Sequence, residues 1–278
     1  MTAIRVAALQ MRSCMDPAAN LARFEALVRE AAGSGARYVQ SPEMTGVLVR
    51  GRDALMERIV PADRDPLISR ASELAAELSI FVHIGSTAVL LDDGKVANRG
   101  FLFGPDGKLI TTYDKIHMFD VDLDNGESWR ESATYAAGGK SVVADLPFAK
   151  LGLSICYDLR FPQLFRAEAL AGAEVLTVPA AFTRQTGEAH WHVLLRARAI
   201  ENGAWVIAAA QGGLHEDGRE TYGHSIIIDP WGRVVADAGN DEPGIVLAEI
   251  DPAASADARR KIPNLKNARD FVQAEVTA

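Results

Sequence analysis

The chain has 278 residues, of which 48% are hydrophobic and 24% are charged. These fractions are typical of a globular protein and exclude a disordered, collagen-like or coiled-coil chain. Its 29 Lys and Arg residues and 37 Asp and Glu residues give a formal net charge of −8, which argues against a protein that binds nucleic acid or an anionic membrane surface.

Only two cysteines occur, Cys14 and Cys156, so we expect neither a disulfide framework nor a cysteine-rich metal site. The first residues predict a β-strand at 4–10 instead of a basic and then apolar leader, and no apolar run approaches the length of a membrane span. We therefore expect no signal peptide, no membrane segment and a cytoplasmic protein.

Strand and helix patterns alternate in the first third of the chain. Asp16 is a helix N-cap and Pro17 suits the first helical position, so a helix is predicted to begin there and to end at Gly33. The other predicted elements are strands at 4–10, 38–40 and 80–90 and an amphipathic helix at 67–78.

The middle of the chain has the pattern of β-hairpins. Strands at 98–103 and 109–112 flank the turn sequence Gly104-Pro105-Asp106-Gly107, and strands at 141–145 and 150–155 flank a second turn.

The last third alternates again, with Gly203 just past the end of a predicted helix. The predicted helices are 162–171 and 188–202, and the predicted strands are 174–179, 205–210, 224–229, 233–237 and 245–250. No long linker and no internal repeat divides the chain. We predict an α/β fold in a single domain, residues 1–278, with two facing sheets and helices outside them.

Cys156 ends an apolar strand and is followed by a polar turn and a helix. A free cysteine is often a buried structural residue. A strand-to-helix elbow, however, exposes the side chain at the strand end, and the helix N-terminus favours a thiolate and a developing oxyanion. Cys14 lies in a polar loop without that setting, and we interpret it as structural.

A cysteine nucleophile needs a base, and no histidine here stands in a recognisable protease signature. Glu43 follows a predicted strand and is a candidate, although alone it reads as an exposed loop carboxylate. Lys115 alone reads as a surface lysine. Local patterns do not bring these residues together.

Three segments, in the order Glu, Lys, Cys, resemble the signature blocks of the nitrilase superfamily of carbon–nitrogen hydrolases, and the resemblance covers almost the whole chain. The segments are Ser41-Pro42-Glu43, Tyr113-Asp114-Lys115-Ile116-His117 and Ile155-Cys156-Tyr157-Asp158-Leu159-Arg160-Phe161-Pro162. The resemblance implies a four-layer αββα sandwich.

The resemblance also implies a mechanism. Glu43 takes the proton of the Cys156 thiol as general base, and the thiolate attacks a carbonyl carbon. Lys115 and the backbone N–H of Tyr157 stabilise the oxyanion. A thioester forms, water hydrolyses it, and no metal or organic cofactor is required. A second glutamate that positions the lysine is expected at Glu131, with Glu127 as the competitor.

Further segments resemble the small-amidase branch, which contains deaminated-glutathione amidase and the ω-amidase acting on 2-oxoglutaramate. They are residues 187–202, 222–225 and 229–232, whereas 212–215 depart from the pattern. We expect hydrolysis of the terminal amide of a small carboxylate-bearing substrate to acid and ammonia. Arg160 alone would be interpreted as a surface residue in an ion pair, but here it is expected to bind the substrate carboxylate. Thr183 and Arg184 are expected to line the mouth of the active site.

Alternatives are an ω-amidase, an N-carbamoyl amidohydrolase or an aliphatic nitrilase, and, outside enzymes, a non-catalytic scaffold. His190 and His192 fall on different faces of a predicted helix, so no metal site is expected. The resemblance implies a homodimer or higher homo-oligomer. Trp191 and Phe165 could present apolar surface for it, although core packing explains such residues more often.

Overall fold

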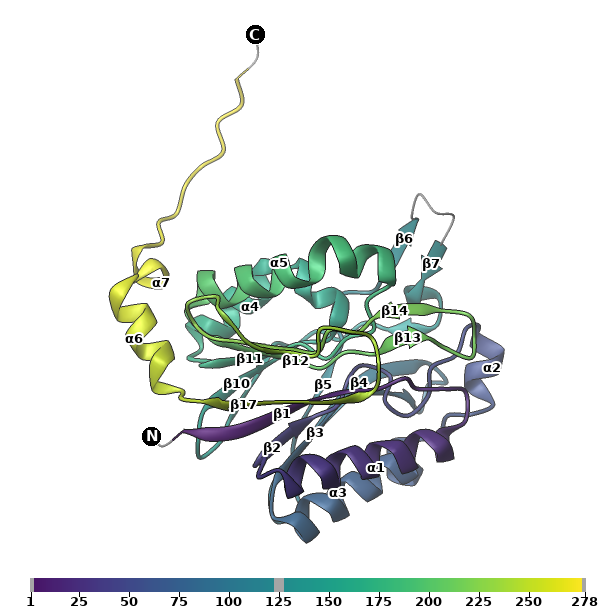
Figure 1. The fold of residues 1–278 in the computed structure, drawn as a ribbon. Helices are drawn as coiled ribbons and strands as arrows, with labels where there is room; N and C mark the ends of the chain where they lie inside the picture. The colour runs from purple at the N-terminus through teal and green to yellow at the C-terminus, as the bar shows by residue number, and fades with distance from the viewer. Residues whose placement is uncertain (1–2, 123–127, 277–278) are drawn as a thin grey trace.

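Two β-sheets form the centre of the molecule (Figure 1). The computed structural model describes residues 3–122 and 128–276. One sheet has seven strands in the order β17-β1-β2-β3-β4-β5, with β8 paired to β4. These strands are β1 (Ile4–Gln10), β2 (Tyr38–Gln40), β3 (Phe81–Leu90), β4 (Val96–Phe103), β5 (Leu109–Asp114), β8 (Tyr135–Ala136) and β17 (Gly244–Ile250).

The other sheet has six strands in the order β16-β15-β12-β11-β10-β9. They are β9 (Val142–Asp145), β10 (Lys150–Leu153), β11 (Val175–Thr177), β12 (Trp205–Ala208), β15 (Ile226–Ile228) and β16 (Val234–Asp237). Two small hairpins stand apart from the sheets. They pair β6 (Asp120–Asp122) with β7 (Ser128–Arg130) and β13 (Gly212–Leu214) with β14 (Glu220–Tyr222).

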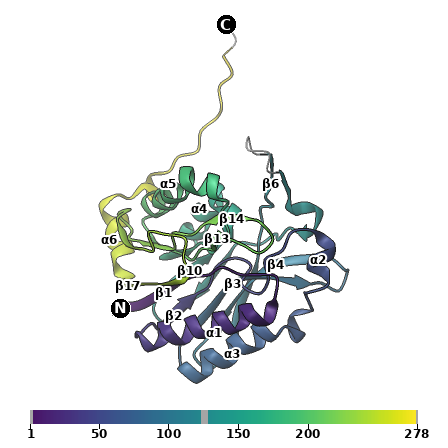
Figure 2. The ribbon, with the colours of Figure 1, turned by 45° about the vertical axis from the view of Figure 1, so that its right-hand side comes forward.

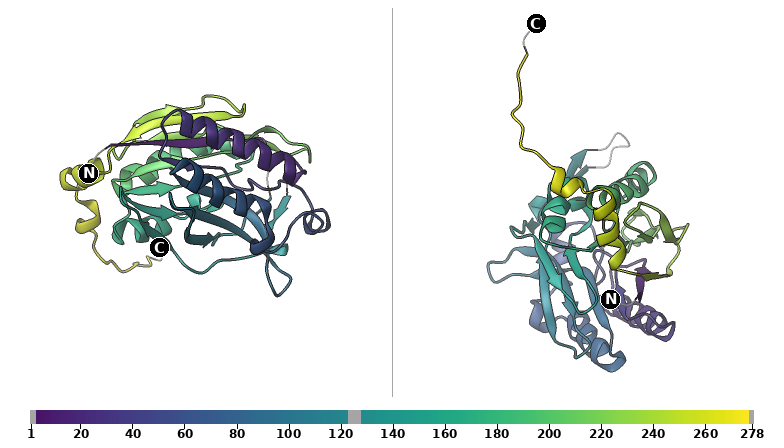
Figure 3. Two further views of the ribbon diagram at one scale, coloured as in Figure 1. Left: turned by 90° about the horizontal axis from the view of Figure 1, so that it is seen from below. Right: turned by 90° about the vertical axis from the view of Figure 1, so that its left-hand side faces the viewer.

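Helices cover the outer face of each sheet. Figure 3, seen from below, shows α1 (Pro17–Gly33) and α3 (Pro66–Leu78) side by side on the first sheet. On the second sheet lie α4 (Pro162–Leu170) and α5 (Arg184–Asn202). The remaining helices are α2 (Arg52–Met56), α6 (Ala253–Lys261), α7 (Asn264–Asn267) and the 3₁₀ turns η1 (Ala62–Arg64), η2 (Glu131–Ala133) and η3 (Cys156–Arg160).

Alternation along β1 shows how the layers are built. Val6 and Ala8 join the buried cluster between the sheets, whereas Ala7 and Leu9 join the cluster beneath α1 and α3. Because successive strand residues point to opposite faces, this one apolar strand packs against the second sheet on one side and against the helices on the other. The predicted four-layer αββα architecture is confirmed.

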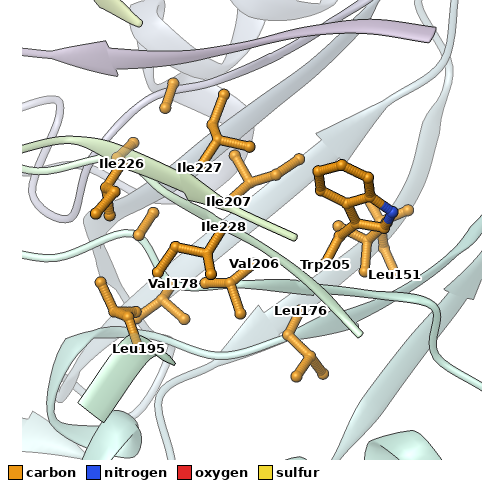
Figure 4. Close-up of a cluster of buried hydrophobic side chains, with 14 of the residues drawn as sticks. Leu151, Leu176, Val178, Leu195, Trp205, Val206, Ile207, Ile226, Ile227 and Ile228 are labelled. Atoms are coloured by element: carbon orange, nitrogen blue, oxygen red, sulfur yellow. The ribbon is translucent and has the colours of Figure 1, made fainter. Parts of the chain in front are cut away.

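The second sheet is apolar on both faces, as its near-continuous runs predict. Ile226, Ile227 and Ile228 are all fully buried and pack with Val206 of β12 and Leu195 of α5 (Figure 4). Trp191 and Phe165 are also buried in this core, so they present no free apolar surface.

Most predicted boundaries agree with the structure, including the Asp16 N-cap, whose side chain accepts a hydrogen bond from Ala18 N. Strands β4, β5, β10, β11 and β12 each have one end that differs from the prediction by two residues, and α5 and β15 differ at their starts. Helix α5 begins at Arg184 instead of residue 188. Strand β15 begins at Ile226 instead of residue 224, because His224 has a φ of 57°, a left-handed conformation that interrupts a strand.

After α7 the chain runs as an extended segment away from the body (Figures 1 and 2). Neither α6 nor this segment was expected from the sequence. Within residues 3–122 and 128–276, no helix combines the length and the apolar character that crossing a bilayer requires.

Candidate active site

Glu43, Lys115 and Cys156 follow the C-terminal ends of β2, β5 and β10. Glu43 and Lys115 come from the first sheet and Cys156 from the second, and all three line one cavity of about 350 Å³. The sandwich therefore joins at one point three residues that are far apart in sequence.

The backbone at Cys156 forms a sharp elbow. Its φ is 50°, a left-handed conformation that is uncommon outside glycine and often occurs at functional sites. The Cys156 N–H donates to Pro179 O at 2.9 Å, which fixes the elbow to the strand end beside it. The thiol is nearly enclosed, with 7% of the residue exposed.

Lys115 lies between two carboxylates. Its Nζ donates to Glu43 Oε1 at 2.8 Å and to both oxygens of Glu131, at 3.0 and 2.9 Å. Only 2% of the lysine is exposed, so this ion cluster is shielded from bulk solvent and its geometry is fixed. Glu131 is itself held by the Phe119 N–H, 2.6 Å from Oε2. Glu127 lies outside the described residues.

The Glu43 carboxylate accepts two further hydrogen bonds from other parts of the chain. Asn98 Nδ2 donates to Oε1 at 2.9 Å, and the Ala181 N–H donates to Oε2 at 3.0 Å. Burial of Glu43 opposes its ionisation, but the charge of Lys115 and hydrogen bonds from Cys156, Lys115 and Asn98 outweigh it. The pKa of Glu43 therefore lies below its usual value.

The other two groups keep their ordinary protonated forms. Burial and the neighbouring Glu43 charge raise the pKa of the Cys156 thiol well above its usual value, despite the opposing charge of Lys115. Burial disfavours the Lys115 ammonium, but Glu131 and Glu43 more than compensate, so the pKa of Lys115 is also raised. The resting site thus pairs a neutral thiol with an ionised base.

Asp158, which the sequence reading did not single out, ties the lysine and cysteine segments together. Its carboxylate accepts hydrogen bonds from Ile155 N at 2.9 Å, Tyr113 Oη at 2.7 Å and His117 N at 3.0 Å. These donors flank Cys156 and Lys115 in the chain. Asp158 is fully buried, so it sets the relative position of both segments.

Tyr157, Arg160 and Thr183 line the cavity, as expected of substrate-contacting residues. The Arg160 guanidinium lies over the Phe182 ring, 5.4 Å from its centroid, and its Nη1 is 3.2 Å from His190 Nδ1. No carboxylate among the described residues forms an ion pair with Arg160. This guanidinium can therefore bind an anion from outside the protein.

Arg184 does not line the cavity, and the expectation that it would was wrong. Because α5 begins at this residue, its side chain turns along the helix to Glu188 at 3.3 Å and across to Asp241 at 3.4 Å. The two helix histidines also diverge, since His192 Nε2 lies 2.8 Å from Asp237 whereas His190 faces Arg160.

Sequence reasoning missed much of the cavity wall, including Arg50, Trp129 and Arg219. Arg219 lies in the turn of the β13–β14 hairpin. The pair Asp217-Gly218 is a turn signal that could have predicted this hairpin, although not which side chain enters the cavity.

Comparison with protein families places this geometry in a known context. The family described as carbon–nitrogen hydrolase matches residues 5–260. The chain belongs to the carbon–nitrogen hydrolase family. A deaminated glutathione amidase of Synechocystis sp. is 42% identical over 96% of this chain and 98% of that protein. The omega-amidase NIT2 of Mus musculus is 38% identical over 97% and 96%.

Solved structures agree with these sequence relatives. The C. elegans NitFhit protein is 33% identical, with a TM-score of 0.89 over 96% of this chain, which spans 65% of that longer chain. Saccharomyces cerevisiae Nit3, of branch 10 of the nitrilase superfamily, is 30% identical, with a TM-score of 0.84 over 94% of both chains. These findings confirm the family resemblance that the three sequence blocks indicated. They also show that this carbon–nitrogen hydrolase is an amidase.

Proposed function

We propose that this carbon–nitrogen hydrolase is a cysteine-dependent amidase in which Cys156 is the nucleophile, Glu43 the general base and Lys115 the oxyanion partner. The observation that carries the proposal is the convergence of Glu43 and Lys115, 2.8 Å apart, on the enclosed Cys156 elbow. A base, a cation and a thiol in one enclosed cavity are the parts that acyl transfer requires.

In the first half of the reaction, Glu43 takes the proton of the Cys156 thiol as sulfur bonds to the amide carbon. The carbonyl electrons move to oxygen, where Lys115 Nζ and the Tyr157 N–H stabilise the charge. The tetrahedral intermediate collapses, the C–N bond breaks, and Glu43 passes its proton to the leaving nitrogen. The acyl group is now a thioester.

In the second half, Glu43 takes a proton from water as the hydroxyl adds to the thioester carbon. Collapse breaks the C–S bond and releases the acid, and Glu43 returns the proton to Cys156 sulfur. Glu131 acts through Lys115, because its two hydrogen bonds hold the ammonium where the oxyanion develops. The Cys156 thiol and water supply the protons and Glu43 transfers them, so these steps need no cofactor.

The substrate class we propose is a small amide that bears a carboxylate. The relatives named deaminated glutathione amidase and omega-amidase support this class, and Arg160 supplies a cavity guanidinium that suits a carboxylate. A primary amide such as 2-oxoglutaramate would release ammonia, whereas deaminated glutathione, whose amide nitrogen is substituted, would release an amine.

Replacement of the nucleophile tests the proposal. Cys156→Ala should lower kcat by about 10⁴-fold or more with only a small change in the unfolding temperature, since alanine keeps the Cβ and removes a single sulfur atom. Cys14→Ala is the matched control and should keep wild-type rates. Full activity in Cys156→Ala would refute the mechanism. N-carbamoyl amines and aliphatic nitriles, assayed beside 2-oxoglutaramate and deaminated glutathione, separate the alternative hydrolases.

A homo-oligomer and a cytoplasmic location stay predictions. Support for self-association comes from apolar residues at the surface of α5 and the β15–β16 turn, namely Val193, Ile200 and Trp231, which are 67%, 52% and 48% exposed. Solvent-exposed apolar groups gathered on one face are typical of protein interfaces. Support for the location is the small number of cysteines.

A further inference from the structure

The side chain of Gln211 joins the segment after β1 to the loop that carries Glu43. Gln211 lies between β12 and β13 and is fully buried. Its Nε2 donates to Ser13 Oγ at 2.7 Å and to the main-chain oxygen of Glu43 at 2.9 Å. Its Oε1 accepts a hydrogen bond from the Ser13 N–H at 2.9 Å. These lengths are those of good hydrogen bonds, so one amide fixes the main chain of Glu43.

The main chain just after Glu43 has an unusual conformation. Met44 has a φ of 56°, in the left-handed region that is unfavourable for a residue with a β-carbon. The Met44 N–H donates to Ser86 Oγ at 3.1 Å, and Gln211 Nε2 lies 3.4 Å from Met44 O. Such a conformation persists only where its surroundings hold it. Release of the carbonyl oxygens of Glu43 and Met44 would therefore let this turn relax.

The main chain of Gln211 holds Glu43 in a second way. The Gln211 N–H donates to Ala180 O at 2.9 Å, and the N–H of the next residue, Ala181, donates to Glu43 Oε2 at 3.0 Å. The oxygen of Gln211 accepts a hydrogen bond from the Gly223 N–H at 2.9 Å. Gln211 thus contacts both the main chain of Glu43 and the segment that binds the Glu43 carboxylate.

The position of Glu43 matters because the proposed reaction moves a proton to or from this residue four times. Its partners are three different atoms, namely the Cys156 sulfur, the leaving nitrogen and the oxygen of water. Each transfer needs a heavy-atom distance of about 2.6–3.2 Å, and a displacement of about 1 Å can lower a rate about 100-fold. A small rotation of the main chain at Glu43 is amplified at the end of its side chain.

We propose that Gln211 is a positioning residue for the general base. Its amide fixes the main chain of Glu43 so that the carboxylate stays within reach of the Cys156 sulfur, the leaving nitrogen and the attacking water. Gln211 does not itself line the cavity, so it acts through Glu43 and contacts no substrate. The inference rests on the proposed amidase function and adds a residue to its machinery.

Gln10 provides a matched control. It is also fully buried, its Nε2 donates to the main-chain oxygens of Asn240 and Glu242 at 2.8 Å each, and its Oε1 accepts from the Ser225 N–H at 2.8 Å. The amide of Gln10 therefore makes the same kinds of contact as that of Gln211, but with segments that carry none of the proposed catalytic residues. Loss of either amide should weaken the fold, and loss of only one should slow catalysis.

Steady-state kinetics of Gln211→Met and Gln10→Met separate positioning from stability. The substrates are deaminated glutathione and 2-oxoglutaramate, and denaturant unfolding checks that both variants are folded at the assay temperature. Gln211→Met should lower kcat by about 10- to 100-fold. It should change KM by less than about threefold, because Gln211 contacts no substrate. Gln10→Met should keep the kcat of the wild type.

Alkylation of the nucleophile gives a second measurement that needs no turnover. Iodoacetamide reacts with the thiolate, and Glu43 must accept the thiol proton for the thiolate to form. In a Cys14→Ala background, Gln211→Met should therefore slow the alkylation of Cys156 by about 10-fold or more. Gln10→Met should leave that rate unchanged.

A folded Gln211→Met enzyme with the wild-type kcat and alkylation rate, or equal losses in the two methionine variants, would overturn the positioning role. Should Gln211→Met fail to fold, Gln211→Asn takes its place, because it keeps a buried amide that is one methylene too short to hold Glu43. The same outcomes then decide. Failure of the amidase proposal shows separately, as no turnover of either substrate by the wild-type enzyme, and alkylation still tests Gln211 in that case.

Discussion

At the scale of single residues, the site depends on one buried ammonium shared by two carboxylates. Two acids this close could not both stay ionised alone, because like charges shielded from bulk solvent repel strongly. Lys115 contacts both, and Asn98 donates to Glu43 Oε1 at 2.9 Å and to Glu131 Oε1 at 3.3 Å. The cluster therefore keeps Glu43 charged beside a thiol whose proton it must accept.

This arrangement predicts a pH dependence set by Glu43. Its pKa lies below the usual 4.5, so kcat/KM should stay level as the pH is lowered and fall only below about 4.5. Asn98→Ala removes one stabilising hydrogen bond from the carboxylate, so the acid limb of its kcat/KM profile should move to higher pH. An acid limb that Asn98→Ala leaves in place would contradict this assignment.

The lowered pKa of Glu43 also makes the free energy of unfolding depend on pH, and acid again has the unfavourable effect. A carboxyl group whose pKa is lower in the folded chain stabilises it fully above its unfolded pKa. That contribution is lost as the pH falls through the folded pKa of Glu43. Chemical unfolding at several pH values should therefore show a smaller pH dependence in Asn98→Ala than in the wild type, because the shift in pKa on folding is smaller.

At the scale of elements, the site depends on how closely the two sheets approach. A Cβ placed on Gly85 in β3 would lie 2.1 Å from Ser41 O and 2.3 Å from the Pro179 side chain. Ser41 precedes Glu43, and Pro179 O accepts the Cys156 N–H. Gly85 therefore lets the loop that carries Glu43 approach the segment at Pro179 that holds Cys156.

Gly85→Ala should damage both folding and catalysis. The added methyl group overpacks a rigid contact that includes backbone atoms, so we expect a loss of about 3 kcal/mol in the free energy of unfolding and a lower kcat. Gly33→Ala is the control, because a Cβ there meets nothing within 4 Å. Denaturant unfolding and kcat measure both effects, and an unchanged Gly85→Ala enzyme would contradict the close approach.

Local patterns predicted the elements well where the signal is local. The Asp16 cap, the Gly203 helix end and the hairpin across residues 104–107 depend only on neighbours in sequence. The short strands β6 and β7 were missed, because they carry too few residues for a periodic pattern. Arg184 was misplaced because the exact start of α5 decides where its side chain points.

At the scale of the whole molecule, composition and periodicity predicted the α/β class, but not how Glu43, Lys115 and Cys156 meet. That meeting depends on pairing between distant strands and between sheets, which no local rule contains. The resemblance to a family supplied it. The cavity wall shows the limit of that route, since Arg50, Trp129 and Arg219 line it but come from three separate segments that share no motif.

Exposed apolar residues on and beside α5 predict that the chain self-associates. Val193 and Ile200 lie on α5, and Arg196 Nε donates to Gly232 O at 2.8 Å, which places Trp231 beside that helix. An exposed apolar face on a chain of net charge −8 is expected to be covered by a second copy, because burying it offsets the modest repulsion between equal charges. Light scattering should give about twice the 29.9 kDa chain mass.

The double variant Val193→Glu, Ile200→Glu should be a folded monomer, because each glutamate would be desolvated at the interface without a partner. Leu170→Glu is the matched control, since Leu170 is also apolar and 64% exposed but lies at the end of α4. It should stay a dimer. A wild-type monomer at micromolar concentration, or a double variant that still dimerises, would place the interface elsewhere. Retention of kcat in the monomeric variant would further show that one chain supplies the complete active site.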